Sequence, residues 1–406
     1  MSLSHHILIY AELLSHLRQI SIGCTLPTPA SSATTSTVSA SGRALTVTHD
    51  GFSETIKLPR IVAPFTQLPV RESGSTSLSW RLPLAATPTG RMPALSEESA
   101  PWSALDLKPG SEVVCRTCQS TIVDVGTLKV WKDLPSENWA EMMEFWHCHK
   151  PHSHTHDKDE EHLTTRGYGA SSRITAQPGV GFVDLTSFLL AKSDLVTSLT
   201  SPSIDSTEAS NQAQGIMTLH CGSCQTQLGV QNNDVSSVSI FKWQVVVQLQ
   251  EQKMPESFPS LAQCVSAMLI ATMARSGCSQ SILLPSKHQS NGMLRSPESK
   301  DGNQGKDLLN IWVFNANFIF SSTEAPASPI NAMKVFYRTV SQEEADKMIE
   351  SMTLGVQDIS LPSEAIAILV DLLQKSNYFV PVSDRRFKDW NVGLLEKWDN
   401  EGGWKP

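Results

Sequence analysis

Hydrophobic and polar positions alternate along several short stretches of the first hundred residues. Apolar side chains occupy every second position over residues 20–26, the spacing of a half-buried β-strand. Residues 7–19 are ambiguous, because their apolar positions also fit one face of a helix. Further alternating pieces, separated by Gly, Pro and Ser, lie at 44–48, 54–58 and 77–82. The pattern predicts an antiparallel β unit over residues 1–110.

Apolar runs in the last third of the chain predict both strands and a helix. Residues 241–249 and 311–320 are rich in β-branched and aromatic side chains and have the length of strands. Residues 260–276 carry apolar side chains at helical spacing. Gly277 follows them, and glycine is common just after the end of a helix. We therefore expect a helix that ends before Gly277.

Two more helices are expected further along. A strand over residues 333–340 leads into a helix at Ser341, because Ser341 and Glu344 have the spacing of a capping box. Pro362 stands at a first-turn position and begins a helix that extends to Lys375. Residues 236–406 are therefore predicted to form a C-terminal α+β unit.

Composition describes a folded chain with polar, uncharged loops. Hydrophobic residues make up 40%, whereas charged residues make up only 18%, below the usual share of about 25%. The formal charge of -8 gives no overall attraction to phosphate backbones, so direct nucleic-acid binding is not expected. No run approaches the roughly 20 apolar residues that cross a bilayer, so no membrane span is expected.

Paired cysteines set the central region, residues 111–235, apart from the rest. Cys115 and Cys118 form one Cys-x-x-Cys pair, and Cys221 and Cys224 form another. Together they supply the four thiolates of a closed tetrahedral zinc site, which would be structural rather than catalytic. We expect this metal to pin the β unit to the α+β unit. Because 102 residues separate the pairs, two unrelated cysteine pairs remain an alternative, and a thioredoxin-like redox role is a weaker one.

Cys148 lies between His147 and His149, after a helix expected over residues 137–146. A thiol beside imidazoles is typical of a nucleophile, since an imidazolium favours the thiolate. The C-terminal end of a helix has the opposite effect on the thiol. Cys148 is therefore a metal ligand, a nucleophile or a buried residue without chemistry.

Other candidates have simpler interpretations. The histidines of residues 152–162 favour a solvated insertion over a metal site. Cys24, Cys264 and Cys278 are expected to be core residues. The aromatic series over residues 377–398 is either a docking strip or a terminal segment packed on the core, and we favour the packed segment.

Several blocks of the sequence together resemble a known family. Cys115-x-x-Cys118, LPSENWAEMMEFWHCH at 134–149, CGSCQTQLG at 221–229 and FKDWNVGLL at 387–395 are similar to the HECT-like ubiquitin-protein ligases, also described as ubiquitin-conjugating-enzyme-binding proteins. The resemblance implies binding to a ubiquitin-conjugating enzyme and promotion of ubiquitin transfer to proteins, in cytoplasm and nucleus. It also makes proteins of pre-mRNA 3′-end processing plausible partners.

One departure from a true HECT ligase matters. Such a ligase carries its thioester cysteine in a C-terminal lobe, whereas this chain has no cysteine after Cys278. Cys148, with His149 as a neighbouring base, is then the candidate for a covalent ubiquitin intermediate. The alternative is a non-catalytic, zinc-stabilised scaffold or assembly factor. For the fold we predict the α+β class, with the central zinc-binding region between the two units.

Overall fold

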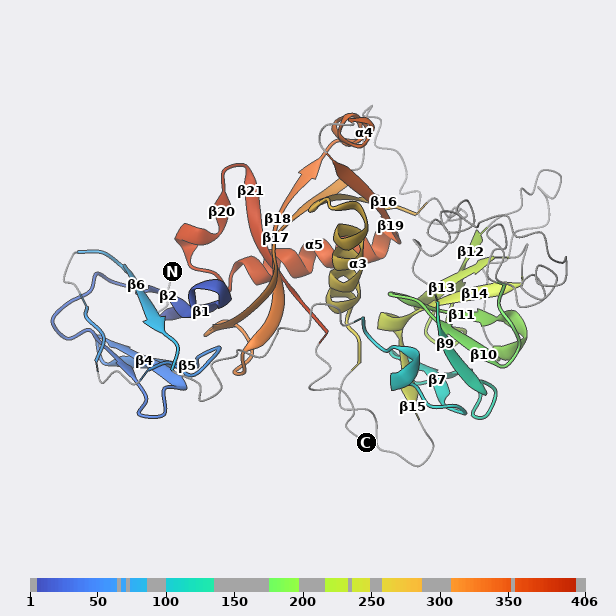
Figure 1. Ribbon diagram of the computed structural model, residues 1–406, viewed down its shortest axis with the longest axis horizontal. Helices are drawn as coiled ribbons and strands as arrows, with labels where there is room; N and C mark the ends of the chain where they lie inside the picture. The colour runs from blue at the N-terminus through green and yellow to red at the C-terminus, as the bar shows by residue number, and fades with distance from the viewer. Residues whose placement is uncertain are drawn as a thin grey trace, which may run out of the picture. The chain divides into compact units, whose positions relative to one another are not determined.

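The computed structural model describes residues 6–63, 67–70, 74–85, 100–134, 175–196, 216–232, 236–248, 258–286, 308–351 and 355–398. The chain forms two compact units (Figure 1). The first unit contains Met1–Ser99, Leu261–Ser286 and Gly302–Asp399, and the second contains Ala100–Ser260, Lys287–Asp301 and Asn400–Pro406. These units do not follow the expected segments 1–110, 111–235 and 236–406, because N-terminal strands pair with C-terminal ones.

A mixed sheet of nine described strands forms the centre of the first unit. Its main path is β20-β21-β18-β17-β1-β2-β6, while β16 lies beside β17 and β19 lies beside β16. The strands are β1 (Leu8–Leu14), β2 (Gln19–Thr25), β6 (Ser77–Pro83), β16 (Gln280–Pro285), β17 (Leu308–Ser322), β18 (Ile330–Val340), β19 (Val356–Leu361), β20 (Arg386–Phe387) and β21 (Trp390–Glu396).

The pairing of β1 with β17 settles the ambiguity of the first residues. β1 is a strand, not a helix, and Tyr10 lies opposite Ser322 in the ladder. Such a partner, distant in the sequence, supplies hydrogen bonds that a local helical pattern could not reveal. The strands expected at 20–26 and 77–82 are confirmed as β2 and β6, which pair with each other.

A second sheet covers one face of β1, β2 and β6. It consists of β3 (Thr35–Val38), β4 (Ala44–His49) and β5 (Phe52–Lys57). The apolar alternation turns one face of each strand inward, so that Ile9, Ile20 and Leu45 are fully buried in a shared core. The predicted N-terminal β unit is thus a two-layer packing joined to the C-terminal strands.

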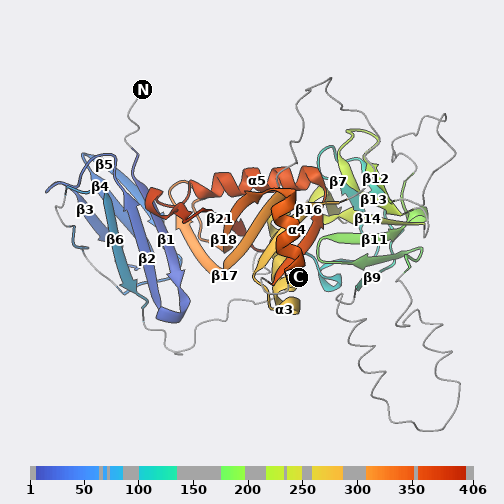
Figure 2. The same ribbon diagram turned by 90° about the horizontal axis from the view of Figure 1, so that it is seen from above.

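Two helices of the first unit, α3 (Leu261–Ser276) and α5 (Ser363–Asn377), contact β21 (Figure 2). A Cβ on Gly393 of β21 would lie 2.6 Å from Leu373 Cδ2, so this glycine lets α5 approach the sheet. α3 ends as predicted before Gly277, whose φ is +70°.

The predicted capping box is present where the third helix, α4 (Gln342–Glu350), begins. The Ser341 hydroxyl accepts a hydrogen bond from the Glu344 backbone N–H at 3.2 Å. None of the described helices is long and apolar enough to cross a membrane. The described chain mixes helices with a large share of strands, consistent with the α+β class.

Short strands build the second unit. Six of them form the sheet β12-β13-β14-β11-β10-β9, and three form the sheet β15-β7-β8. The strands are β7 (Glu112–Cys115), β8 (Thr121–Val123), β9 (Val130–Asp133), β10 (Val180–Val183), β11 (Ser187–Ala191), β12 (Ile216–His220), β13 (Gln227–Asn232), β14 (Ser237–Phe241) and β15 (Val245–Gln248).

One expected strand differs from the structure. The neighbouring strands β8 and β9 do not pair with each other, because β8 pairs with β7 and β9 pairs with β10. Residues 241–249 are not one strand, because Lys242–Gln244 form a 3-10 turn between β14 and β15. The buried Lys242 ammonium donates hydrogen bonds to the Pro101 and Trp102 carbonyls, which fixes this turn. The helix expected over 137–146 lies outside the described residues.

Candidate metal centre

The first cysteine pair lies in the tight turn between β7 and β8. The Cys115 backbone N–H donates to the Ser120 carbonyl at 2.8 Å, and the Gln119 N–H donates to the Cys115 carbonyl at 2.8 Å. Gln119 has a φ of +62°, in the left-handed region that turns the chain back toward β8. This closed turn directs both sulfur atoms to the same side, and we call it the first knuckle (residues 115–120).

The second pair lies in a turn of the same design between β12 and β13. The Cys221 N–H donates to the Thr226 carbonyl, and the Gln225 N–H donates to the Cys221 carbonyl, both at 2.9 Å. Gln225 has a φ of +60°. This second knuckle (residues 221–226) therefore repeats the backbone of the first, residue for residue.

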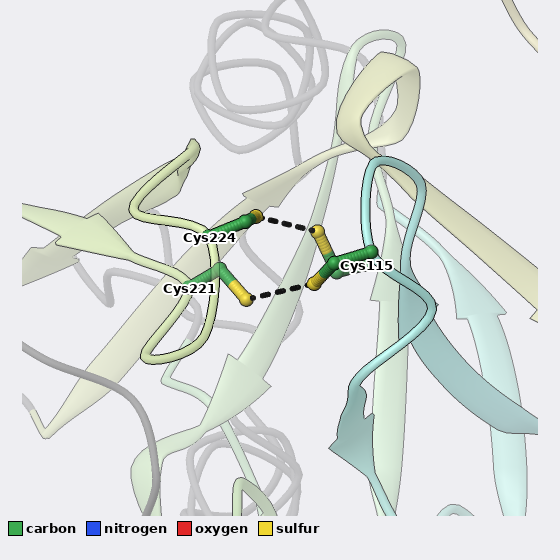
Figure 3. A group of neighbouring side chains, drawn as sticks. Cys115, Cys221 and Cys224 are labelled. Carbon is green, nitrogen blue, oxygen red and sulfur yellow. Dashed lines mark hydrogen bonds between the residues drawn. The ribbon is translucent and has the colours of Figure 1, made fainter.

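All four sulfur atoms converge between the two knuckles (Figure 3). Cys115 Sγ lies 3.7 Å from Cys224 Sγ, and Cys118 Sγ lies 3.5 Å from Cys221 Sγ. The four sulfurs all lie within 4.8 Å of one another, so the group could hold a metal ion. The structure thus brings together the two pairs despite their separation in the sequence.

Strand order explains why the knuckles meet. β13 leaves the second knuckle and pairs with β14, and after the Lys242–Gln244 turn β15 pairs with β7. Val245 of β15 lies opposite Cys115 itself. The Arg116 side chain also donates hydrogen bonds to the Trp243 and Pro259 carbonyls. The segment after the second knuckle therefore positions the first knuckle, through β15 and the carbonyls that Arg116 contacts.

All four cysteines belong to the second unit. The expectation that a metal would pin the N-terminal β unit to the C-terminal α+β unit was wrong. A metal here would join two hairpins of the same unit.

The surroundings of the sulfur atoms differ. Burial raises the pKa of the Cys115 thiol to about 12. Hydrogen bonds from the Ser120 hydroxyl, and then from its backbone N–H, lower the pKa of Cys118 to about 6. The Thr226 hydroxyl and backbone lower the pKa of Cys224 in the same way. Hydrogen bonding therefore favours the thiolate forms of Cys118 and Cys224, whereas burial favours the protonated form of Cys115.

Most remaining candidates lie away from this centre or outside the described residues. Cys148 and His149 lie outside them, as do His147 and the histidines of residues 152–162. Cys24 and Cys264 are buried, as predicted for core residues, and Cys278 is half-buried.

The aromatic series at the C-terminal end packs into the sheet, as favoured. Val392, Leu394 and Leu395 of β21 are buried, and so is Trp398. Tyr378 and Phe387 are exceptions, since 62% and 43% of their surfaces are exposed.

Sequence reasoning missed the residues that follow each second cysteine. Gln119 and Gln225 supply the left-handed turns, while Ser120 and Thr226 supply hydroxyls next to the sulfurs. The signal is visible in the sequence, because CRTCQS and CGSCQT repeat both the glutamine and a hydroxyl-bearing residue at the same positions.

Sequence comparisons identify relatives of this chain and its family. The chain is 26% identical over 367 residues to an uncharacterized protein of Schizosaccharomyces pombe, an alignment that covers 86% of this chain and 94% of that protein. It is 38% identical over 52 residues to an uncharacterized protein of Saccharomyces cerevisiae, covering 12% of this chain and 15% of that one. No solved structure matches the chain. The model of the HECT-like ubiquitin-conjugating enzyme (E2)-binding family matches residues 12–392, which confirms the resemblance and supports a role in the ubiquitin pathway. The chain therefore belongs to the HECT-like E2-binding family.

Proposed function

We propose that this protein binds a ubiquitin-conjugating enzyme and promotes transfer of ubiquitin to protein substrates, in the cytoplasm and the nucleus. The family match over residues 12–392 supports the binding half of this proposal. The convergence of the four cysteines supports a metal-stabilised body on which that binding would take place.

Zinc is the metal we propose for the cysteine centre. Zn–S bonds of about 2.3 Å in a tetrahedron place sulfur atoms about 3.8 Å apart. Two separations across the knuckles, 3.5 Å and 3.7 Å, are close to that value, and all sulfur pairs lie within 4.8 Å. Four thiolates fill the coordination sphere and leave no position for substrate or water, so the ion would stabilise the fold rather than catalyse. Because iron also accepts four thiolates, metal analysis must identify the ion.

For the transfer step we propose Cys148 as the acceptor thiol. Its thiolate would attack the carbonyl carbon of the enzyme–ubiquitin thioester, forming a new thioester and releasing the conjugating enzyme's thiol. His149 would take the Cys148 proton as general base, and a substrate amine would then displace the Cys148 thiolate. Among the described cysteines outside the cluster, Cys24 and Cys264 are buried and Cys278 is half-buried, so none of the three is a fully exposed nucleophile.

Discharge of ubiquitin-charged conjugating enzymes tests this function directly. The full chain is mixed with a panel of charged enzymes, and both ubiquitin release and adduct formation are followed with and without reductant. We expect accelerated discharge by at least one enzyme and a reductant-sensitive adduct that is lost in Cys148→Ser. Cys278→Ser, which removes a half-buried thiol elsewhere, serves as the control. Absence of discharge across the panel would contradict the proposal, and unaltered discharge by Cys148→Ser would leave the binding role without the covalent step.

A non-catalytic assembly role is the second candidate, with pre-mRNA 3′-end processing proteins as partners. The first unit favours it, because aromatic rings are exposed on its sheet: Phe314 is 60% exposed and Phe387 is 43% exposed. Phe387 stacks on Phe336 with ring centroids 5.0 Å apart. Clustered exposed rings are typical of docking surfaces. Capture of a processing protein that weakens in Phe314→Ser and Phe387→Ser, without ubiquitin-dependent change in that protein, would favour this role.

A further inference from the structure

Each knuckle carries two hydroxyl side chains that its cysteine pair does not require. They occupy the third and sixth positions of the repeat, as Thr117 and Ser120 in the first knuckle and as Ser223 and Thr226 in the second. The backbone of the turn needs neither hydroxyl, because its hydrogen bonds join main-chain atoms. Their repetition therefore calls for an explanation in the side chains themselves.

One thiol–hydroxyl–hydroxyl chain begins at the first knuckle. Cys118 Sγ and Ser120 Oγ are 3.2 Å apart, and the Ser120 hydroxyl donates to Ser223 Oγ at 2.9 Å. Ser223 belongs to the other knuckle. This hydrogen-bond chain thus begins at Cys118, a candidate metal ligand of the first knuckle, and ends at Ser223 of the second knuckle.

A matching chain runs in the opposite direction. Cys224 Sγ and Thr226 Oγ1 are 3.2 Å apart, and the Thr226 hydroxyl donates to Thr117 Oγ1 at 3.3 Å. The sixth position of each knuckle therefore touches its own cysteine and the third position of the other knuckle. Two hydrogen-bond chains of opposite direction therefore join the two knuckles beside the sulfur atoms.

The direction of the sulfur–hydroxyl hydrogen bonds is fixed once a metal binds the sulfurs. A thiolate that binds a metal has no proton and can only accept a hydrogen bond. A hydroxyl both donates and accepts and can rotate, so Ser120 and Thr226 can turn their hydrogens toward sulfur while accepting from Ser223 and Thr117. Such outer partners orient metal ligands and strengthen metal binding.

We propose that Ser120 and Thr226 are positioning residues of the cysteine centre, each orienting a ligand thiolate and joining it to the opposite knuckle through Ser223 or Thr117. This inference rests on the proposed metal site. It assigns these hydroxyls to the metal's outer shell and makes the centre one connected structure rather than two independent turns.

The test measures the apparent zinc affinity of the full chain by competition with a chromophoric chelator. Ser120→Ala combined with Thr226→Val should lower the affinity by about 10-fold to 100-fold, the usual effect of removing outer-shell partners. Ser120→Thr and Thr226→Ser, which keep the hydroxyls, should restore most of it. Thr55→Ala, which removes an exposed hydroxyl bonded to Thr46 at 2.8 Å in the first unit, should have no effect.

Coupling between variants separates positioning from general destabilisation. Ser120→Ala and Ser223→Ala interrupt the same hydrogen-bond chain. The double variant should therefore lose scarcely more zinc affinity than Ser120→Ala alone. Ser120→Ala and Thr226→Val interrupt different chains, so their effects should add. The thiolate-to-Co²⁺ charge-transfer bands of the cobalt-loaded protein should shift in the hydroxyl-deleted variants and return in Ser120→Thr.

Two results overturn the inference. If the parent binds zinc tightly and the Ser120→Ala, Thr226→Val protein binds it equally well, the outer-shell assignment fails while the metal site stands. If the parent binds no zinc in the same titration, the metal site itself fails and the inference falls with it.

Discussion

The two units are stabilised by different means. In the first unit the paired strands β17 and β18 are 15 and 11 residues long. In the described part of the second unit the strands are only three to six residues long, as in β8 and β13. It has a buried core as well, with Phe188 fully buried, and in addition the cysteine centre joins two segments that lie far apart in the sequence. A metal bound there would therefore matter more to this unit than to the other.

Metal removal should therefore produce the largest difference between the two units. Structural zinc contributes about 10 to 16 kcal/mol in small modules, as much as the whole stability of a typical domain, which is about 5 to 15 kcal/mol. A strong chelator should speed hydrogen exchange in β7, β8, β12 and β13 by orders of magnitude while β17 and β18 stay protected. Equal protection of both units before and after chelation would contradict the difference.

A cavity in the core of the first unit should destabilise that unit and leave the second unit unchanged. Leu45 is fully buried between the two sheets, so Leu45→Ala should cost about 2 to 5 kcal/mol of unfolding free energy. Denaturant unfolding followed by hydrogen exchange should locate the loss in β1, β2 and β4. Zinc content should not change, and loss of zinc would show that the units are not energetically separate.

A single methyl group should destabilise the second unit without touching the sulfurs. A Cβ on Gly229 of β13 would lie 2.0 Å from the Ser239 carbonyl oxygen of β14, so Gly229→Ala must push the two strands apart. We expect a cost of about 1 to 3 kcal/mol, the usual range for overpacking, and weaker zinc retention. An unchanged melting temperature in Gly229→Ala would contradict the close packing.

The smallest effect concerns thiol reactivity, which leaves stability unchanged. As long as the first knuckle stays folded in zinc-free protein, hydrogen bonds from Ser120 hold the pKa of Cys118 at about 6 and favour its thiolate at pH 7.5. Burial holds the pKa of Cys24 at about 12. Alkylation at Cys118 should be fast and should slow as the pH falls through about 6, and zinc should protect it. Peptide mapping would show Cys24 labelled only after unfolding. Equal labelling rates at the two cysteines would contradict these assignments.

The sequence predicted those features of the fold that depend on residues close together in the chain. The Ser341 cap, the end of α3 at Gly277 and the β2 alternation all depend on contacts within a few residues. β1 was ambiguous because its partner β17 lies about three hundred residues away in the chain.

The candidate site shows the same limit. Two Cys-x-x-Cys turns are local, and both were predicted. Their meeting depends on β15 returning beside β7 at Cys115, a long-range pairing that no spacing encodes. The prediction that a metal would join the β unit to the α+β unit was wrong for this reason. It required knowing which strands lie next to each knuckle.

Native mass spectrometry of the purified full chain tests the central claim most directly. We predict one zinc ion per chain, lost when Cys115, Cys118, Cys221 and Cys224 are all replaced by serine. A parent protein without stoichiometric zinc, or a fourfold variant that keeps it, would contradict the assignment of the metal to these four sulfurs.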